Sequence, residues 1–204
     1  MTSNMMNLSQ LGGRLVDLRL LTRADYPDLA ETCLEPEIWR ETIARMRTAD
    51  DLEAYLDAGL EQHAMGQATP FVIRLQDTGT AVGSTRLART GHSGALEIGW
   101  TFVAPAWHRK GINAESKLLL LDHAFGPAGC GRVLFKVSKG NRRSIAALTS
   151  FGATPSLLPG LPSTIATGAP VSWFEALAEN WPESRAVLAS RVARALEEAT
   201  AASS

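Results

Sequence analysis

The chain has 204 residues, of which 45% are hydrophobic and 20% charged, and its formal net charge is −1. That length fits one domain with a well-formed core, and the composition is ordinary for a globular protein. A net charge near zero gives no electrostatic case for nucleic acid, which needs a concentrated basic face, so no nucleic-acid partner is expected. The most apolar run, Leu118 to Leu121, is far shorter than the roughly 20 residues that cross a bilayer, so no membrane partner is expected either.

Only two cysteines are present, Cys33 and Cys130, and the four histidines are scattered along the chain. A disulfide framework and a metal site are therefore not expected, and the reducing cytoplasm is the expected location. The polar start of the chain lacks the basic and apolar segments of a signal peptide. Residues 1–10 and 200–204 are expected to be flexible tails of a single domain that spans residues 1–204.

Hydrophobic periodicity predicts the elements in chain order. A strand is expected at about 15–21, a helix at about 24–33 capped by Thr22 with Asp25, and an amphipathic helix over 50–65 that Pro70 separates from the next strand. Then come strands at 71–75, 81–88 and 96–103, a buried helix at 112–125, a strand at 132–137, a helix at 141–151, a strand at 171–176 and a helix at about 182–198. An antiparallel meander followed by a strand–helix–strand–helix unit implies a mixed sheet with helices packed on it, an α/β architecture.

The junction from Pro105 to Glu115 is the most informative stretch. A strand ends there, a basic loop with Arg109 and Lys110 follows, and a buried helix starts after Gly111. A helix N-terminus leaves about four backbone N–H groups unpaired, and their partial positive charge attracts phosphate. The natural ligand of this junction is a pyrophosphate; the alternative is an ordinary turn with solvated basic residues. Neither a Walker loop nor a dinucleotide-binding glycine fingerprint is present.

Several short motifs between residues 14 and 152 occur together in one order. They are Arg14 to Arg19, Val82-Gly83, Leu96 to Trp100, Pro105, His108 to Glu115, Ala124-Phe125 and Asn141 to Ser144. Together they resemble the GNAT superfamily of acetyltransferases and, within it, the RimJ/RimL branch, named for enzymes that acetylate the N-termini of ribosomal proteins. The resemblance implies the GNAT fold, a mixed and mostly antiparallel sheet with helices packed on both faces.

The resemblance also implies acetyl-CoA as the co-substrate. Backbone groups near Phe102 and Val103 are expected to hold the pantetheine arm like an added strand, and amides of the loop after Pro105 to bind the pyrophosphate. The expected cofactor-binding residues are Phe102, Val103, His108, Arg109, Lys110, Gly111, Ile112, Asn113, Ala114, Asn141 and Ser144. His108 and Asn113 depart from the family pattern. Cofactor binding is still expected, because the implied contacts are made by the backbone.

Glu97 is the candidate general base for acetyl transfer, acting through a water molecule. A carboxylate beside an apolar sheet can have its pKa raised toward neutrality, which suits removal of a proton from an ammonium group. The alternative is a solvated strand-end glutamate, or one paired with an arginine such as Arg86. A backbone N–H near Phe102 is expected to polarise the thioester carbonyl, and Trp100 to form a wall of the acceptor pocket or only to pack.

Ser144 is the candidate acid for the leaving thiolate, because the two tyrosines, Tyr26 and Tyr55, lie far upstream of the cofactor segments. The alternative is that Ser144 only accepts hydrogen bonds from backbone N–H groups at the start of its helix. Cys130 and His123 are expected to be buried core residues. The segment from Thr154 to Pro170, which holds four prolines, is expected to be irregular, and it shapes the acceptor site or forms a mobile hairpin.

Three functions remain open at this point. The first is an N-acetyltransferase for a protein N-terminus or peptide, and the second is the same reaction on a small amine. The third is a non-catalytic acyl-CoA sensor or interaction module built on the same fold. The last predicted helix has Val187, Leu188, Val192 and Leu196 on one face. That apolar face, together with the pairing common in the resembled branch, favours a homodimer.

Overall fold

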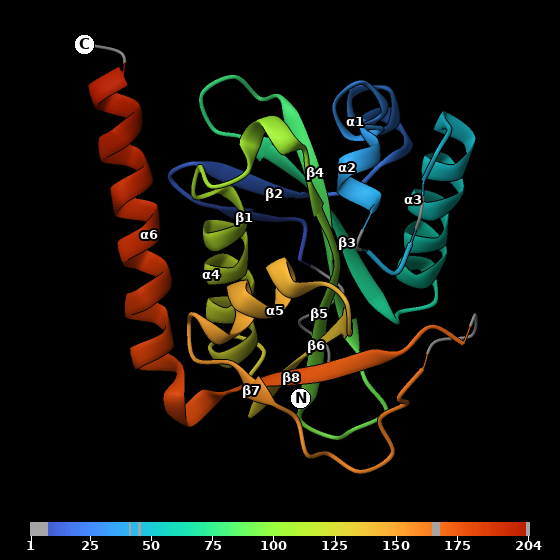
Figure 1. Cartoon of the computed structure of the whole chain (residues 1–204), viewed down its shortest axis with the longest axis vertical. Coiled ribbons are helices and arrows are strands. Elements are labelled where there is room, and N and C mark those ends of the chain that lie inside the picture. The colour runs from blue at the N-terminus through green and yellow to red at the C-terminus, as the bar shows by residue number, and fades with distance from the viewer. Residues whose placement is uncertain (1–7, 41, 45, 165–167, 203–204) are drawn as a thin grey trace.

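The computed structural model describes residues 8–40, 42–44, 46–164 and 168–202. Its centre is one eight-stranded sheet in the order β1-β2-β3-β4-β5-β6-β8-β7 (Figure 1). Neighbouring strands are antiparallel except β5 and β6, which run parallel. The strands are β1 (Gln10–Gly12), β2 (Val16–Leu20), β3 (Ala68–Leu75), β4 (Ala81–Arg89), β5 (Ala95–Val103), β6 (Arg132–Ser138), β7 (Thr154–Pro155) and β8 (Val171–Leu177).

Helices cover both faces of this sheet (Figure 1). They are η1 (Arg23–Asp25), α1 (Tyr26–Cys33), α2 (Pro36–Trp39), α3 (Ala49–Ala64), η2 (Pro105–Trp107), α4 (Ile112–Phe125), α5 (Arg142–Thr149), η3 (Ala178–Asn180) and α6 (Trp181–Ala202). Each face has its own hydrophobic core: Leu120, Leu148 and Leu188 belong to the core under α4, α5 and α6, and Leu29 and Leu56 to the core under α1, α2 and α3. Of the helices in the described ranges, none is long and apolar enough to cross a membrane.

Most predicted elements are present, with small shifts at their ends. The expected break at Pro70 is wrong, because β3 already begins at Ala68. The preceding helix ends instead at Ala64, and Gly66 turns the chain with a φ of 71°. The short elements β1, α2 and β7 were not predicted. Gln10 belongs to β1 and residues 200–202 to α6, where tails were expected; residues 1–7 and 203–204 lie outside the described residues.

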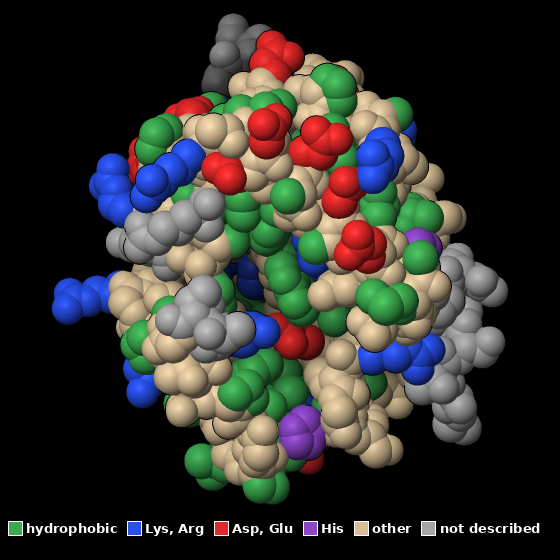
Figure 2. Space-filling model, turned by 90° about the vertical axis from the view of Figure 1, so that its right-hand side faces the viewer, with side chains coloured by type: hydrophobic (Ala, Val, Ile, Leu, Met, Phe, Trp, Pro, Cys, Tyr) green, Lys and Arg blue, Asp and Glu red, His purple; other side chains and the backbone are tan. Residues whose placement is uncertain are grey.

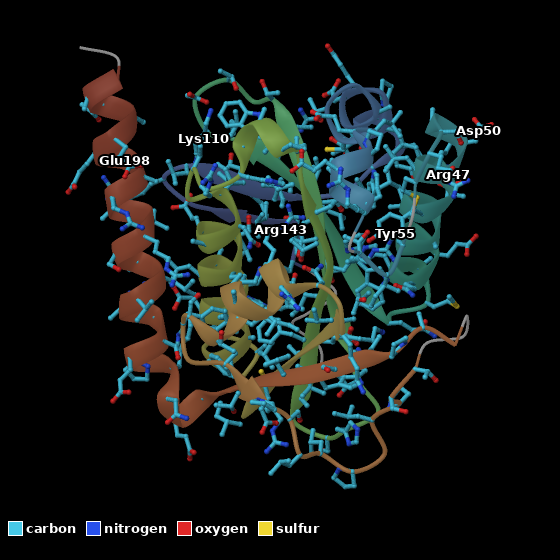
Figure 3. The ribbon with its side chains drawn as sticks, in the orientation of Figure 1. Arg47, Asp50, Tyr55, Lys110, Arg143 and Glu198 are labelled. Atoms are coloured by element: carbon cyan, nitrogen blue, oxygen red, sulfur yellow. The ribbon has the colours of Figure 1, made fainter. Side chains whose placement is uncertain are left out.

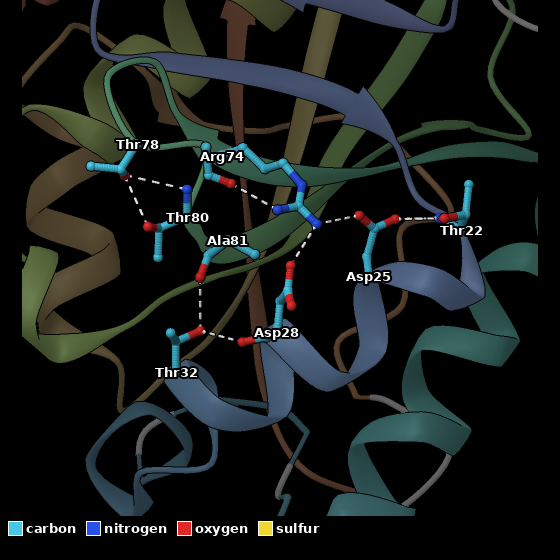
Figure 4. Close-up of polar contacts among 9 residues, drawn as sticks. Thr22, Asp25, Asp28, Thr32, Arg74, Thr78, Thr80 and Ala81 are labelled. Carbon is cyan, nitrogen blue, oxygen red and sulfur yellow. Dashed lines mark hydrogen bonds and ion pairs between the residues drawn. The ribbon is translucent and has the colours of Figure 1, made fainter.

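The predicted cap at the start of the first helix is confirmed, and an ion pair ties it to the sheet (Figure 4). One oxygen of Asp25 accepts hydrogen bonds from the N–H and the hydroxyl of Thr22, each at 2.8 Å. The other oxygen of Asp25 lies 2.7 Å from Arg74 of β3, which also contacts Asp28 at 2.9 Å and the carbonyl of Gly79 at 2.7 Å. Helix α1 is therefore fastened to the β3–β4 hairpin by one guanidinium group.

Helix α6 packs along α4. The rings of Trp181 and Phe125 lie 5.5 Å apart, and Leu188 and Val192 are buried. The apolar face that favoured a homodimer is thus largely covered by the chain itself, with only Val187 exposed among its large side chains. The homodimer stays a prediction that rests on the resemblance alone.

A buried carboxylate joins α4 to the start of the sheet. The side chain of Glu115, a residue only 3% exposed, accepts hydrogen bonds from three successive N–H groups, those of Arg14 (2.8 Å), Leu15 (2.6 Å) and Val16 (2.8 Å). Gly13 leaves room for it, because a Cβ there would lie 2.5 Å from the Glu115 carboxyl carbon. The carboxylate thus supplies the acceptors that this turn needs.

We predict that Glu115→Ala lowers the free energy of unfolding by about 3 kcal/mol or more, because it leaves three N–H groups without their acceptor. Glu115→Gln keeps one acceptor oxygen and is expected to lose less. The matched control is Glu61→Ala, which removes an exposed carboxylate from α3 and is expected to change stability by at most about 0.5 kcal/mol. Urea unfolding followed by circular dichroism measures all three; equal midpoints for Glu115→Ala and the control would contradict the prediction.

Candidate active site

Strands β5 and β6 part in the middle of the sheet. They pair only from Ala95 to Glu97 on β5, although β5 continues to Val103 and β6 continues beyond its last paired residue, Leu134, to Ser138. Backbone N–H and C=O groups inside a protein need hydrogen-bonding partners. The parting therefore leaves a strand edge that a ligand can pair with, as in β-strand addition. A cavity of about 920 Å³ lies at this place and is lined by both strands.

A β-bulge changes the direction of β5 at the same place. Ser84 faces Phe102 and Arg86 faces Gly99, so two residues of β5 stand opposite one residue of β4. One of the two, Trp100, has a left-handed backbone with a φ of 52°. That conformation is costly for a residue other than glycine and is found most often at functional sites. Gly83 allows the close approach of β4, because a Cβ there would lie 2.2 Å from the Phe102 carbonyl oxygen.

The side chain of Tyr55, on α3, reaches the bulge in β5. Its hydroxyl donates a hydrogen bond to the carbonyl of Trp100 at 3.1 Å, and it lines the cavity. Under it lies Arg86, 2% exposed, whose guanidinium carbon is 4.8 Å from the centre of the Tyr55 ring and 5.3 Å from that of Trp100. Arg86 donates to the Tyr55 carbonyl and to Gln62 of α3. Tyr55 is far upstream of the cofactor segments in the sequence, but the fold brings it to the cavity.

Glu97 lies on the wall of the cavity and is 7% exposed. Burial raises the pKa of its carboxyl group, and the nearby Lys136 ammonium opposes that shift. The Lys136 Nζ lies 3.6 Å from a Glu97 oxygen and 5.2 Å from the ring centres of both Trp100 and Trp173. Lys136, and not Arg86, is thus the cation beside Glu97, and nothing in the residues around position 136 indicated it.

The start of α4 has the backbone expected of an anion site. Gly111 is the N-cap of the helix with a φ of 77°, and Arg109 two residues earlier has a φ of 62°. Where left-handed and right-handed backbone conformations alternate, successive N–H groups point to one place, and an anion can bind there. The Lys110 side chain points elsewhere, because its Nζ lies 4.6 Å from the centre of the Trp107 ring. The His108 ring nitrogen Nε2 lies 2.9 Å from the Val103 carbonyl oxygen.

At the start of α5, Asn141 is the capping residue. Its side-chain oxygen accepts a hydrogen bond from the N–H of Ser144 at 2.9 Å. Local amide capping is therefore done by Asn141, and the hydroxyl of Ser144 is on a side chain that lines the cavity. Of all the site residues expected from the sequence, only Lys110 does not line the cavity.

The cavity also has charged residues that the sequence did not single out. Lys117 lies one turn into α4 and donates a hydrogen bond to the side-chain oxygen of Asn113. Burial lowers the pKa of Lys117 to about 8. The others are Arg143 of α5 and Arg191, Arg194 and Glu198 of α6.

The two ends of the cavity lie on opposite sides of the sheet. Figure 3 shows Arg143 and Glu198 on the side of α5 and α6, and Tyr55 on the side of α3. On the face that carries α3, hydrophobic side chains line a hollow, with acidic side chains on the surface above it (Figure 2). The end near α4 and α6 is cationic, and the end near α3 is mostly apolar and aromatic.

Other candidates of the sequence lie elsewhere. Cys130 and His123 are buried and do not line the cavity. Over the described ranges, no group of three or more His, Cys, Asp or Glu residues is placed to hold a metal ion.

Comparison with known protein families decides the identity of the fold. A sequence profile described as "Acetyltransferase (GNAT) domain" matches residues 15–154. The chain belongs to the GNAT acetyltransferase family. Members of this family transfer acetyl groups from acetyl-CoA, and the mixed eight-stranded sheet with helices on both faces is the GNAT fold predicted from the sequence.

Solved structures agree with this assignment. A protein from T. thermophilus, described as a candidate acetyltransferase, is 28% identical with a TM-score of 0.75, over 90% of this chain and 97% of that one. A GCN5-related N-acetyltransferase from Brucella melitensis is 20% identical with a TM-score of 0.75, over 89% and 84%. RimJ of Mycobacterium smegmatis, solved with CoA-disulfide, is 21% identical with a TM-score of 0.71, over 91% and 97%. The last two likenesses show the fold alone. Comparison with curated proteins finds no match.

Three observations indicate that the residues of this GNAT domain fit coenzyme A. The alternating backbone at Arg109 and Gly111 offers N–H groups and the helix N-terminus to an anion. The unpaired edge of β5 can accept an amide-containing chain as an added strand. The cavity volume of about 920 Å³ lies in the upper part of the range of ligand sites, which is roughly 300–1,000 Å³.

We predict that Lys136→Met raises the pKa of Glu97 further, because it removes the cation that now opposes the effect of burial. Carbon-detected NMR titration of the side-chain carboxyl groups measures this, with Glu97→Gln identifying the signal. The matched control is Lys139→Met, which removes an exposed lysine three residues along the chain. An unchanged Glu97 pKa in Lys136→Met would show that the two groups do not interact in solution.

Proposed function

We propose that this protein is an acetyl-CoA-dependent N-acetyltransferase that moves an acetyl group to a primary amine, with Glu97 as the general base. One observation carries the proposal: a single cavity joins the anion site at the start of α4 to the buried Glu97 carboxylate through the gap between β5 and β6. Acetyl-CoA supplies an activated acetyl thioester. The chain's residues then need to hold it, to take a proton from the amine and to return one to the sulfur.

Glu97 is suited to the first proton transfer. Because burial raises the pKa of its carboxyl group, the carboxylate is a stronger base than a solvated glutamate. It accepts the proton that the acceptor ammonium loses, directly or through a water molecule. The Lys136 ammonium at 3.6 Å opposes this rise in the pKa of Glu97 and so favours the ionised carboxylate.

Two hydroxyl groups can return a proton to the sulfur. Ser144 lines the cavity at the start of α5, and Tyr55 lines it from α3. Burial raises the pKa of Tyr55, so its hydroxyl keeps its proton at neutral pH, but that proton is donated to the Trp100 carbonyl. Ser144 lines the cavity and, among the described residues, its hydroxyl makes no hydrogen bond to a fixed acceptor, so we assign it the role of acid.

The acceptor is proposed to carry an apolar group next to its amine. The part of the cavity away from α4 is walled by side chains that are mostly aromatic or aliphatic, namely Ile38, Trp39, Ile43, Tyr55 and Trp100. Removing such apolar walls from water favours binding of an apolar group, and the Glu97 carboxylate at their edge favours an ammonium group. Both a peptide N-terminus with a large first residue and a small hydrophobic amine meet these requirements. RimJ/RimL-like action on a ribosomal protein in the cytoplasm is one form of the first.

The direct experiment is an acceptor screen that follows free thiol release from acetyl-CoA. Peptides whose first residue is Ser, Met, Leu or Phe are compared with phenethylamine, hexylamine and a polyamine. We expect turnover with the hydrophobic amines or peptides and little with the polyamine. If acetyl-CoA binds but no amine is acetylated, a non-catalytic acyl-CoA sensor is the better description.

We predict that Glu97→Gln lowers kcat by roughly 10²–10⁴-fold, the usual contribution of a general base. Acetyl-CoA affinity is expected to stay the same, because the anion site lies on α4. In the parent, kcat is expected to rise with pH through the raised pKa of Glu97, since only the ionised carboxylate accepts a proton. The loss in Glu97→Gln is expected to shrink at high pH, where more of the amine is already neutral.

The control for this variant is Glu61→Gln, the same change at an exposed position of α3. Steady-state rates from pH 5 to 10 and calorimetric titration with acetyl-CoA test both variants. An unchanged rate and pH profile in Glu97→Gln would assign Glu97 a structural role.

A further inference from the structure

Helix α6 forms one wall of the cavity at its cationic end. Five of its residues line it: Leu188, Arg191, Arg194, Ala195 and Glu198. The match to the family profile ends at residue 154, before α6 begins at Trp181. This wall therefore comes from a part of the chain outside the matched domain, and α4 and α5 supply the other two walls.

The position of α6 against the anion site is fixed by close contacts. A Cβ on Gly111 would lie 2.8 Å from the Cβ of Ala195, so the helix rests directly on the N-cap of α4. Arg191 donates a hydrogen bond to the carbonyl of Ser150, just after α5, at 3.0 Å. At the other end of the helix, Arg185 pairs with Asp122 of α4 at 2.8 Å. The arginines of α6 are thus carried by a rigid element.

The charges at this end are unbalanced. The described lining residues here include five cations, Arg109, Lys117, Arg143, Arg191 and Arg194, and one carboxylate, Glu198. Glu198 lies 3.9 Å from Arg194, and both side chains are about 70% exposed, so this pair is weak. Lys117 donates to the neutral side chain of Asn113. Such an excess of cations around a cavity attracts a polyanion.

Coenzyme A carries two anionic parts, a pyrophosphate and a phosphate monoester on the 3′ position of its ribose. The amides at the start of α4, with Arg109, suit the pyrophosphate. The monoester has about −1.5 to −2 charges at neutral pH and three acceptor oxygens. One arginine guanidinium group can donate two parallel hydrogen bonds to two of these oxygens. The two arginines of α6 lie beside the pyrophosphate site, one helical turn apart, because residues 191 and 194 share a face.

We propose that α6 binds the 3′-phosphate of coenzyme A through Arg191 and Arg194. This inference rests on the proposed function, since it assumes that coenzyme A occupies the cavity. It makes the C-terminal helix a specificity element that separates coenzyme A from dephospho-coenzyme A, the same molecule without the 3′-phosphate. Glu198 is the competing anion for Arg194 when the cavity holds no phosphate.

The test measures the Kd of coenzyme A and of dephospho-coenzyme A by calorimetry. The parent is expected to bind coenzyme A at least about tenfold more tightly, as two charge-assisted contacts imply. In the double variant Arg191→Gln/Arg194→Gln this ratio is expected to fall toward one, while the Kd of dephospho-coenzyme A stays the same. Glu198→Gln is expected to increase the ratio, because it removes the competing anion.

The matched control is Arg185→Gln, the same change on the same helix at a residue that does not line the cavity; its ratio is expected to equal that of the parent. Thermal unfolding checks that each variant folds. If the double variant does not fold, the exposed Arg194→Gln alone carries the test, with a smaller fall in the ratio expected.

Two outcomes overturn the inference while leaving the proposed function intact. In one, the parent binds both ligands equally well. In the other, the double variant loses affinity for both ligands by the same factor, which would place its arginines at the pyrophosphate. Failure of the parent to bind either ligand is a third and different result, because it removes the proposed function together with the inference.

Discussion

The architecture of the site depends on one constraint, the need of buried backbone groups for hydrogen-bonding partners. Strands β5 and β6 run side by side in the sheet, but their pairing stops at Glu97 and Leu134. Beyond that point the protein keeps the two edges apart with a bulge at Trp100 and with α5 packed beneath the gap. A ligand that brings amides of its own can satisfy the open edge, and the cavity exists because the sheet leaves that edge open.

The two ends of the cavity have different chemistry because they belong to different layers. On the α4 side, a helix N-terminus and a group of cations surround the entrance, which suits phosphates. On the α3 side, Tyr55 and Trp100 sit over the buried guanidinium of Arg86. Among the described lining residues, Glu97 and Lys136 are the charged side chains of that wall. The gap between the strands is where the two ends meet, so it is the point at which the proposed reaction between a phosphate-bearing donor and an apolar amine would take place.

Local sequence was enough to select residues that line the cavity where those residues lie on one continuous segment. The strand–loop–helix from Glu97 to Ala114 carries most of the anticipated residues, and its glycine, its basic loop and its helix start are all neighbours in sequence. Tyr55 was rejected because it is 45 residues from Trp100, whose carbonyl it binds. Lys136 was overlooked for the same reason: its partners Glu97 and Trp173 come from two other strands. Such contacts follow from sheet order, which no local pattern encodes.

The contact over Gly111 has a consequence for how the protein is made. Leu15 and Ala195 both lie against this glycine, so the turn between β1 and β2 and the helix α6 pack over the same loop. During synthesis, the start of α4 leaves the ribosome well before residue 195 does. The nascent chain then has the loop without the helix that packs on it, and Gly111 reaches its final surroundings only when α6 has emerged and docked. Ligand binding at this loop stabilises the state in which α6 is docked. The cellular pool of that ligand is therefore expected to favour the final step of folding as well as the chemistry.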